Sequence, residues 1–187
     1  MLKARIGMVA AGVVAAVGLV FVVSSAMASE NDEIKKIADL VKKGDMPGAK
    51  KLAVAYAKAH SDVDELMTAF KPAKKGGIGV TGSEKGIENV LTQVGRDAPT
   101  AANLTKMSDA YAEMGYNIAA VGLITEALAP EKNSGKKTRD SWIEWSKGTI
   151  DAGLKLADAA KSKSSADVKT HASKVNTSCN SCHTTFR

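Results

Sequence analysis

The sequence has few of the residues that mark several common protein classes. It contains only two cysteines among 187 residues, which excludes a disulfide-rich scaffold. Aromatic residues make up 4% of the chain, and there are four prolines. Its 26 basic and 20 acidic residues are dispersed, whereas a nucleic-acid binder gathers basic residues into a stripe. We therefore expect no nucleic-acid partner.

What the sequence does contain indicates a folded domain. Hydrophobic residues make up 44% of the chain and charged residues 25%, a balance that argues against disorder. The length is sufficient for one domain of ordinary size with its own core. Only one stretch, near the N-terminus, is apolar enough to approach a membrane span.

That stretch has the organisation of a secretory signal peptide. Lys3 and Arg5 form a positive region, residues 6–23 are uncharged, and Ala26-Met27-Ala28 is a small-x-small cleavage signature. We predict a signal peptide over residues 1–28, cut after Ala28. The alternative is an uncleaved membrane anchor, the one case in which we expect a membrane association. In both cases the remainder lies outside the cytoplasm, in the periplasm or an equivalent exported compartment.

The rest of the chain shows helical periodicity. Asp45 is placed as an N-cap with Pro47 in the first turn of its helix, and Ser61 as the N-cap of the next helix. Pro72 stops that helix. The apolar spacing predicts helices over residues 33–41, 45–56, 61–70, 87–94, 101–128, 138–160 and 166–184.

No segment has the alternating pattern of a strand pair. Long helices joined by short loops favour antiparallel neighbours, so the sequence predicts an all-α, up-and-down bundle. Gly77-Ile78-Gly79-Val80-Thr81-Gly82 fits the letters of a dinucleotide fingerprint, but a helix and a proline precede it instead of a strand. We interpret it as a loop.

One motif carries the chemistry. Cys179-Asn180-Ser181-Cys182-His183 is C-x-x-C-H, the attachment signature of c-type haem. On a helix the two thiols share one face, from which they reach the two vinyl groups of the porphyrin. The adjacent His183 then serves as the proximal iron ligand. Attachment requires an exported chain, which the signal peptide predicts independently.

Three other interpretations of the two cysteines were considered. A thioredoxin-like dithiol needs a βαβ setting, which the sequence does not predict. A structural zinc site needs four ligands, and no second Cys or His pair is present. A disulfide between Cys179 and Cys182 would close a very short loop and stabilise little.

The motif lies on the last predicted helix, four residues from the end of the chain. In this placement the chain resembles class II cytochromes c, which comprise the cytochrome c′ group and its low-spin relatives. The resemblance covers residues 61–187 and implies a four-helix bundle, which leaves residues 29–60 as an N-terminal helical extension. The segment from Met67 to Val80, Asn176-Thr177-Ser178 and Phe186-Arg187 also look like stretches of exported bacterial monohaem cytochromes.

The sixth iron ligand decides between functions. The resemblance implies that Met67 is the distal ligand, as in the low-spin branch; in cytochrome c′ this position is apolar and the iron is open to small gases. The alternative is that Met67 packs in the hydrophobic core and does not bind the iron. Met107 and Met114 are rivals that core packing explains better. His60 is a further candidate for the distal ligand, and we expect His171 at the surface.

We therefore expect a protein that carries single electrons between redox protein partners, with haem c attached at Cys179 and Cys182, and no enzymatic activity. One alternative is a gas-binding haem protein with an open distal site. Another is a haem subunit of a larger redox complex, docked through residues 29–60. Class II relatives are often dimers, so a homodimer is possible. Lys71, Lys74 and Lys75 are expected to be solvated, with contact to an acidic partner as an alternative.

Overall fold

The computed structural model describes residues 29–187, and the predicted signal peptide lies outside them. Within this range the chain is helical, and the only β-type pairings are the isolated bridges Val80–Ser83 and Ser134–Lys137. The all-α prediction is confirmed. No helix in residues 29–187 is both long enough and apolar enough to cross a membrane.

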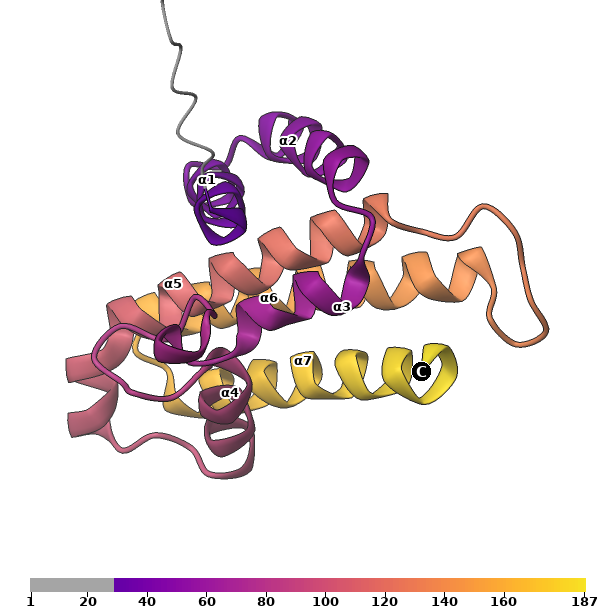
Figure 1. The fold of residues 1–187 in the computed structure, drawn as a ribbon. Helices are drawn as coiled ribbons and strands as arrows, with labels where there is room; N and C mark the ends of the chain where they lie inside the picture. Colours follow the sequence, from indigo (N-terminus) through magenta and orange to yellow (C-terminus); the bar gives the residue numbers. More distant parts are fainter. Residues whose placement is uncertain (1–28) are drawn as a thin grey trace, which may run out of the picture.

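Three long helices form the body of the fold (Figure 1): α5 (Ala101–Ala127), α6 (Arg139–Lys161) and α7 (Ser165–Phe186). α5 packs against α6, and α6 packs against α7. Side-chain caps set the starts of α5 and α6, since Thr100 and Thr138 accept hydrogen bonds from Asn103 N and Ser141 N. A long loop, residues 128–138, joins α5 to α6, and a short turn, residues 162–164, joins α6 to α7, so that consecutive helices run antiparallel.

The α5–α6 crossing is close because glycines face each other. A Cβ atom on Gly115 would lie 2.6 Å from the carbonyl oxygen of Gly153, and one on Gly153 would lie 2.8 Å from the carbonyl oxygen of Gly115. Helices approach this closely only where side chains are absent. Leu156, Ile118 and Ile124, each with less than 2% of its surface exposed, fill the space around the crossing.

The N-terminal extension is a helical hairpin of α1 (Glu30–Lys42) and α2 (Met46–Ala59). Asp45 caps α2 by accepting a hydrogen bond from Gly48 N, as the sequence predicts. The hairpin packs on α5 and lies above it in Figure 1. The apolar face of α1 is buried there, formed by Ile34, Ile37, Ala38 and Val41.

The segment that leads into the bundle is shorter than predicted. Only α3 (Val63–Leu66) is α-helical, and η1 (Met67–Phe70) continues it as a 3-10 helix. The N-cap is Asp62, not Ser61: its side chain accepts from Asp64 N and Glu65 N. Lys71, held extended before Pro72, ends the segment. The bundle thus has three long helices and a short, two-part first segment.

A glycine-rich loop follows and packs back on this segment. It contains η2 (Ala73–Lys75). A Cβ on Gly77 would lie 2.0 Å from Lys71 O, and one on Gly86 would lie 2.4 Å from Phe70 O, so neither position accepts a side chain. Because no strand precedes it, the loop interpretation of residues 77–82 is confirmed within the described chain.

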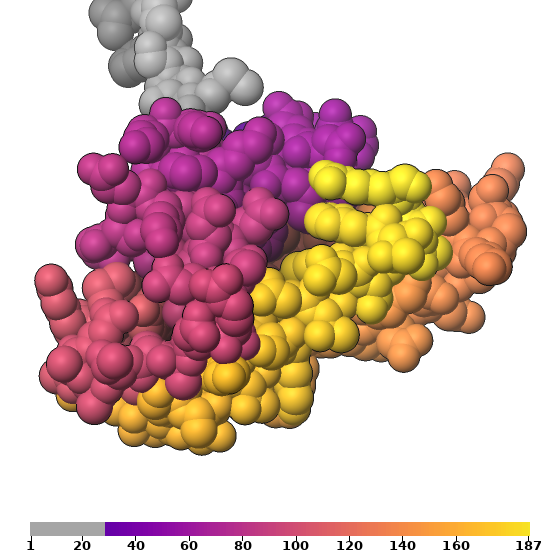
Figure 2. Space-filling model, turned by 90° about the horizontal axis from the view of Figure 1, so that it is seen from below, coloured from indigo at the N-terminus to yellow at the C-terminus, as the bar shows by residue number. Residues whose placement is uncertain are grey.

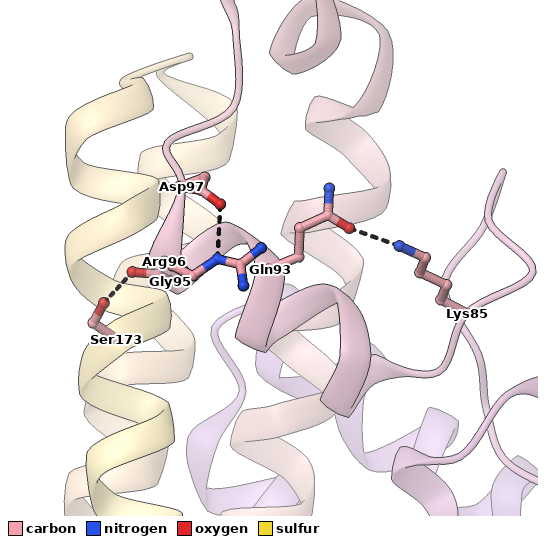
Figure 3. A network of polar contacts seen from close by, with 6 residues as sticks. All are labelled: Lys85, Gln93, Gly95, Arg96, Asp97 and Ser173. Carbon is pink, nitrogen blue, oxygen red and sulfur yellow. Dashed lines mark hydrogen bonds and ion pairs between the residues drawn. The ribbon is translucent and has the colours of Figure 1, made fainter.

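α4 (Ile87–Arg96) closes the fold by packing against α7. Figure 3 shows the polar contacts at its C-terminal end, where Ser173 Oγ donates to Gly95 O at 2.7 Å. In the same view Arg96 Nε contacts Asp97 at 2.9 Å and Lys85 Nζ donates to Gln93 Oε1 at 2.8 Å. Of these contacts the Ser173–Gly95 hydrogen bond joins α4 to α7, and Asn176 Nδ2 of α7 adds a second by donating to Leu91 O at 3.3 Å.

Candidate functional site

A single cavity brings together the predicted site residues from opposite ends of the described chain. Met67, Cys179, Cys182 and His183 all line it, and it contains about 410 Å³ of empty space, part of which is open to solvent. In Figure 2 the C-terminal part of α7 (yellow) lies beside a hollow that purple and magenta segments border. The remaining walls come from η1, α5, α6 and α7: Phe70, Val121, Gly122, Thr125, Trp145, Ser146, Thr149 and Ser178.

The helix α7 places the motif side chains on one face. Cys179, Cys182 and His183 are separated by three and one positions, so they project from adjacent turns toward the same side. Both thiols are free and half-buried, which excludes a disulfide between them in this structure. The close approach of α6 helps, since a Cβ on Gly148 would lie 2.9 Å from Ser178 Oγ.

Burial controls the protonation of these groups. It raises the pKa of the Cys179 thiol to about 11 and also raises the pKa of the Cys182 thiol. A redox-active dithiol needs a lowered thiol pKa, so the environment argues against that interpretation. Burial, with the nearby positive charge of Arg187, lowers the pKa of His183, which favours the neutral imidazole that binds metals.

Zinc is also disfavoured. Among residues 29–187 no group of three or more His, Cys, Asp or Glu side chains is arranged to hold a metal ion. The cavity instead offers two thiols, one imidazole, one thioether and otherwise mostly apolar walls. Such a donor set suits a large apolar cofactor with a central metal better than a bare ion.

The rival ligands lie elsewhere. Met107 packs beside Gly82, and Met114, 2% exposed, lines a different cavity. His60 is the C-cap of α2 and contacts Glu30 at 3.0 Å and Glu33 at 3.7 Å. His171 is half-buried on α7, not fully at the surface as expected, and burial lowers its pKa.

Sequence reasoning missed the polar part of the lining. Thr125 and Thr149 donate their hydroxyl hydrogens to the carbonyls of Val121 and Trp145 one turn earlier, so their methyl groups remain available to the cavity. Ser178 and Trp145 precede Cys182 and Thr149 by one helical turn each. That spacing is the only sequence signal for them, and it requires knowing which faces of α5, α6 and α7 meet.

Phe186 holds the end of α7 against α6. Its ring meets Trp142 edge-on at 4.7 Å and Trp145 at 5.9 Å between centroids. Lys137 Nζ donates to its carbonyl oxygen at 3.2 Å. These contacts fasten the last turn of α7, which carries His183, to the start of α6.

Comparison with protein families adds one finding. Residues 137–187 match the model of the family described as Cytochrome C'. The match spans α6 and α7 with the C-x-x-C-H motif, and supports a cytochrome c′-like family. No curated protein and no solved structure matches the chain.

The family binds covalently attached c-type haem, so haem c is the cofactor of this chain. Cytochrome c′ proteins are in general haem carriers, not enzymes, and are typically periplasmic. The cavity fits this cofactor in its chemistry, because two free thiols, a neutral imidazole and apolar side chains converge on it.

Proposed function

We propose that the chain is an exported monohaem c-type cytochrome that carries single electrons between redox protein partners. Cys179 and Cys182 hold haem c covalently, and His183 is the proximal ligand of its iron. Met67 is the distal ligand. The observation that carries the proposal is that these four side chains line one cavity, although Met67 is remote from the motif in sequence.

The cofactor supplies a metal that changes its oxidation state by one electron. The protein supplies ligation, orientation and a dry environment. Phe70 and Val121 form apolar walls, and Trp145 is anchored by Phe186. No nucleophile and base pair is needed for this function.

Covalent attachment is tested by mass spectrometry of the mature chain. The C-terminal peptide is expected to carry the added mass of one haem. The Cys179→Ser, Cys182→Ser double variant is expected to lose that mass. Haem mass on another peptide, or none at all, would overturn the proposed attachment.

Distal ligation is tested by the optical spectrum of the ferric protein. With Met67 bound we expect a low-spin spectrum with a thioether–iron charge-transfer band, and Met67→Leu should become high-spin. Met107→Leu is the matched control, since Met107 does not line the cavity. A low-spin spectrum that survives Met67→Leu would remove Met67 from the proposal.

The second candidate is a gas-binding haem protein with an open distal site. The match to the Cytochrome C' family favours it, because the resemblance implies a five-coordinate iron in that group. A high-spin spectrum of the unaltered ferric protein, together with reversible binding of carbon monoxide by the ferrous protein, would support it over electron transfer.

Two further parts of the proposal concern the setting. We infer that residues 1–28 are removed on export, which N-terminal sequencing of the mature protein tests: it should begin at Ser29. A haem subunit of a larger redox complex remains the third possibility. Co-purification at low salt, with and without residues 30–60, distinguishes it from a freely diffusing carrier.

A further inference from the structure

The two proposed iron ligands that line the haem cavity, His183 and Met67, are held by the fold in different ways. His183 lies on α7, a helix of 22 residues, whereas Met67 lies on η1, a 3-10 helix of four residues. The hydrogen bonds of so short a helix hold it weakly, because 3-10 geometry is poor and most helical stability comes from packing. The position of Met67 therefore depends on what packs against η1.

The glycine-rich loop grips the C-terminal end of η1 through its backbone. Ile78 N donates to Ala69 O at 2.9 Å, and Gly79 N donates to Lys71 O at 3.3 Å. Ala69 is 2% exposed, so this end of η1 is covered. Both hydrogen bonds join main-chain atoms, and they therefore fix the path of the backbone that follows Met67.

Two glycines allow this close approach. A Cβ on Gly77 would overlap the carbonyl group of Lys71, and one on Gly86 would lie 2.6 Å from Lys71 C and from Pro72 N. Neither glycine has a positive φ, so the backbone conformation alone would permit another residue at either position. Glycine is required because the backbone of residues 70–72 lies so close.

The elements that grip η1 are themselves attached to the rest of the fold. Asn31 Nδ2 of α1 donates to Gly76 O at 2.8 Å, just before the loop reaches Gly77. Gly86 is the N-cap of α4, which packs against η1 and against α7. Two hydrogen bonds from α7 side chains hold that helix. η1 is therefore held by a loop tied to α1 and by a helix tied to α7.

We propose that Gly77 and Gly86 are positioning residues for the distal iron ligand: by letting the backbone close on residues 69–72, they keep Met67 in the haem cavity. The inference rests on the proposed ligation of the haem iron by Met67. Neither glycine lines the cavity, so their effect is exerted through η1.

An added methyl group at either glycine meets backbone atoms, which cannot rotate aside as a side chain can. The loop and η1 must then separate, which strains the hydrogen bond between Ile78 and Ala69. As η1 shifts, Met67 leaves the iron in a larger fraction of molecules. An external ligand competes with Met67 for the distal position, so its apparent affinity rises in proportion to that fraction.

The experiment is a titration of the ferric holoprotein with imidazole, followed by the optical spectrum. Met67→Leu gives the affinity without a competing side chain. Gly77→Ala and Gly86→Ala are each expected to raise the affinity about tenfold or more. Gly82→Ala is the matched control: it is strained by a φ of +75° in the same loop, but its Cβ meets only Met107, at 3.6 Å. It should change the affinity less than about twofold.

The same titration in the Met67→Leu background separates positioning from a general loosening of the fold. Gly77→Ala should have no further effect there, since the side chain that it positions is absent. An equal rise in both backgrounds would overturn the proposal, as would an unaltered affinity in both glycine variants. If Met67→Leu itself leaves the affinity unchanged, the proposed ligation by Met67 fails, and this inference fails with it.

A second measurement needs neither glycine variant and decides the question where those variants do not fold. Coupling is reciprocal, so ligation by Met67 must stabilise the loop as much as the loop stabilises ligation. Hydrogen exchange of the Ile78 amide should be about fivefold or more faster in the Met67→Leu holoprotein. The Gly44 amide, bonded to Val41 O at 3.0 Å in the hairpin turn, is the control and should be unchanged. Equal exchange of the Ile78 amide in both proteins would refute the positioning role.

Discussion

Phe186 anchors the turn of α7 that carries His183. Helix ends fray when nothing holds them, and α7 ends only three residues after His183. The contacts of Phe186 with Trp142 and Trp145 oppose this fraying. Aromatic pairs of this geometry contribute about 0.5–1.5 kcal/mol each beyond the area they bury.

Phe186→Ala is therefore expected to lower the free energy of unfolding by about 2–3 kcal/mol, less than the cost for a fully buried ring. It should also reduce the fraction of chains that carry covalent haem, measured by intact mass. Thr184→Ala, an exposed position in the same turn, is the control and should carry haem normally. Full haem loading of Phe186→Ala would contradict the anchoring role.

Tyr56 provides a second prediction at this scale. Burial, aided by the negative charges of Glu30, Glu33 and Glu65, raises its pKa to about 12. In the unfolded chain the phenol ionises near its ordinary value of about 10. The neutral phenol therefore contributes stability that is fully present below about pH 10 and is lost as the pH rises toward 12.

From pH 10 upward, Tyr56 should make the free energy of unfolding fall by up to about 1.4 kcal/mol for each pH unit. In Tyr56→Phe this part of the alkaline loss should disappear. At neutral pH the variant should be at least as stable, because the Tyr56 hydroxyl is buried without a partner among the described residues. Chemical denaturation at several pH values measures both effects; parallel pH profiles would refute the assignment.

At the scale of elements, the α5–α6 pair depends on backbone approach. Gly115→Ala places a methyl group 2.6 Å from Gly153 O, and a backbone atom cannot move aside without separating the helices. We expect a loss of about 1–3 kcal/mol in the free energy of unfolding, the usual cost of overpacking.

Gly148→Ala is the matched comparison. Its added methyl group meets only Ser178 Oγ, at 2.9 Å, and that side chain can rotate. A gain of about 1 kcal/mol in helix propensity offsets the strain, so this variant should be nearly neutral. Thermal unfolding of both variants tests the difference; equal losses would mean that helix approach is not the limiting factor.

The same elements show which features could be predicted from sequence. The apolar spacing predicts a helix over 101–128 and another over 166–184, and the structure has them at Ala101–Ala127 and Ser165–Phe186. These helices depend on local periodicity and caps such as Thr100. Residues 67–70 are instead a 3-10 helix. Lys71 after them is extended, as expected for the residue before a proline, and the loop packs back on Phe70, a tertiary contact that periodicity does not predict.

The residues of the candidate site likewise fall into those that the local sequence identifies and those that depend on tertiary packing. The C-x-x-C-H motif is contiguous, so Cys179, Cys182 and His183 are readable from sequence alone. The proximity of Met67 depends on how η1 is placed beside the cavity that α5, α6 and α7 also line, which periodicity does not define. The cavity that Met114 lines could not be predicted either, because Lys35 of α1 and Asn117 of α5 line it together only once the hairpin packs on α5.

At the scale of the whole molecule, the question is whether residues 29–60 form an appendage or part of the core. The buried face of α1 and the buried residues Ala49, Ala53 and Tyr56 of α2 belong to the same hydrophobic cluster as Leu104 and Ile118 of α5. Leu52 and Val54, on either side of the buried Ala53, are exposed at 40% and 45%. The hairpin therefore contributes its inner face to the core and leaves two large apolar side chains exposed.

Deletion of residues 30–60 should therefore expose apolar surface of α5 and increase binding of an apolar dye. It should also lower the melting temperature by well over about 2–4 °C, since a loss of 1 kcal/mol alone shifts Tm by that amount in a domain of this size. Leu52→Ser with Val54→Thr, which alters only exposed side chains of α2, should leave Tm nearly unchanged. Differential scanning calorimetry of the holoproteins measures both. A shortened chain that melts like the full one would show that the hairpin adds no stability to the bundle.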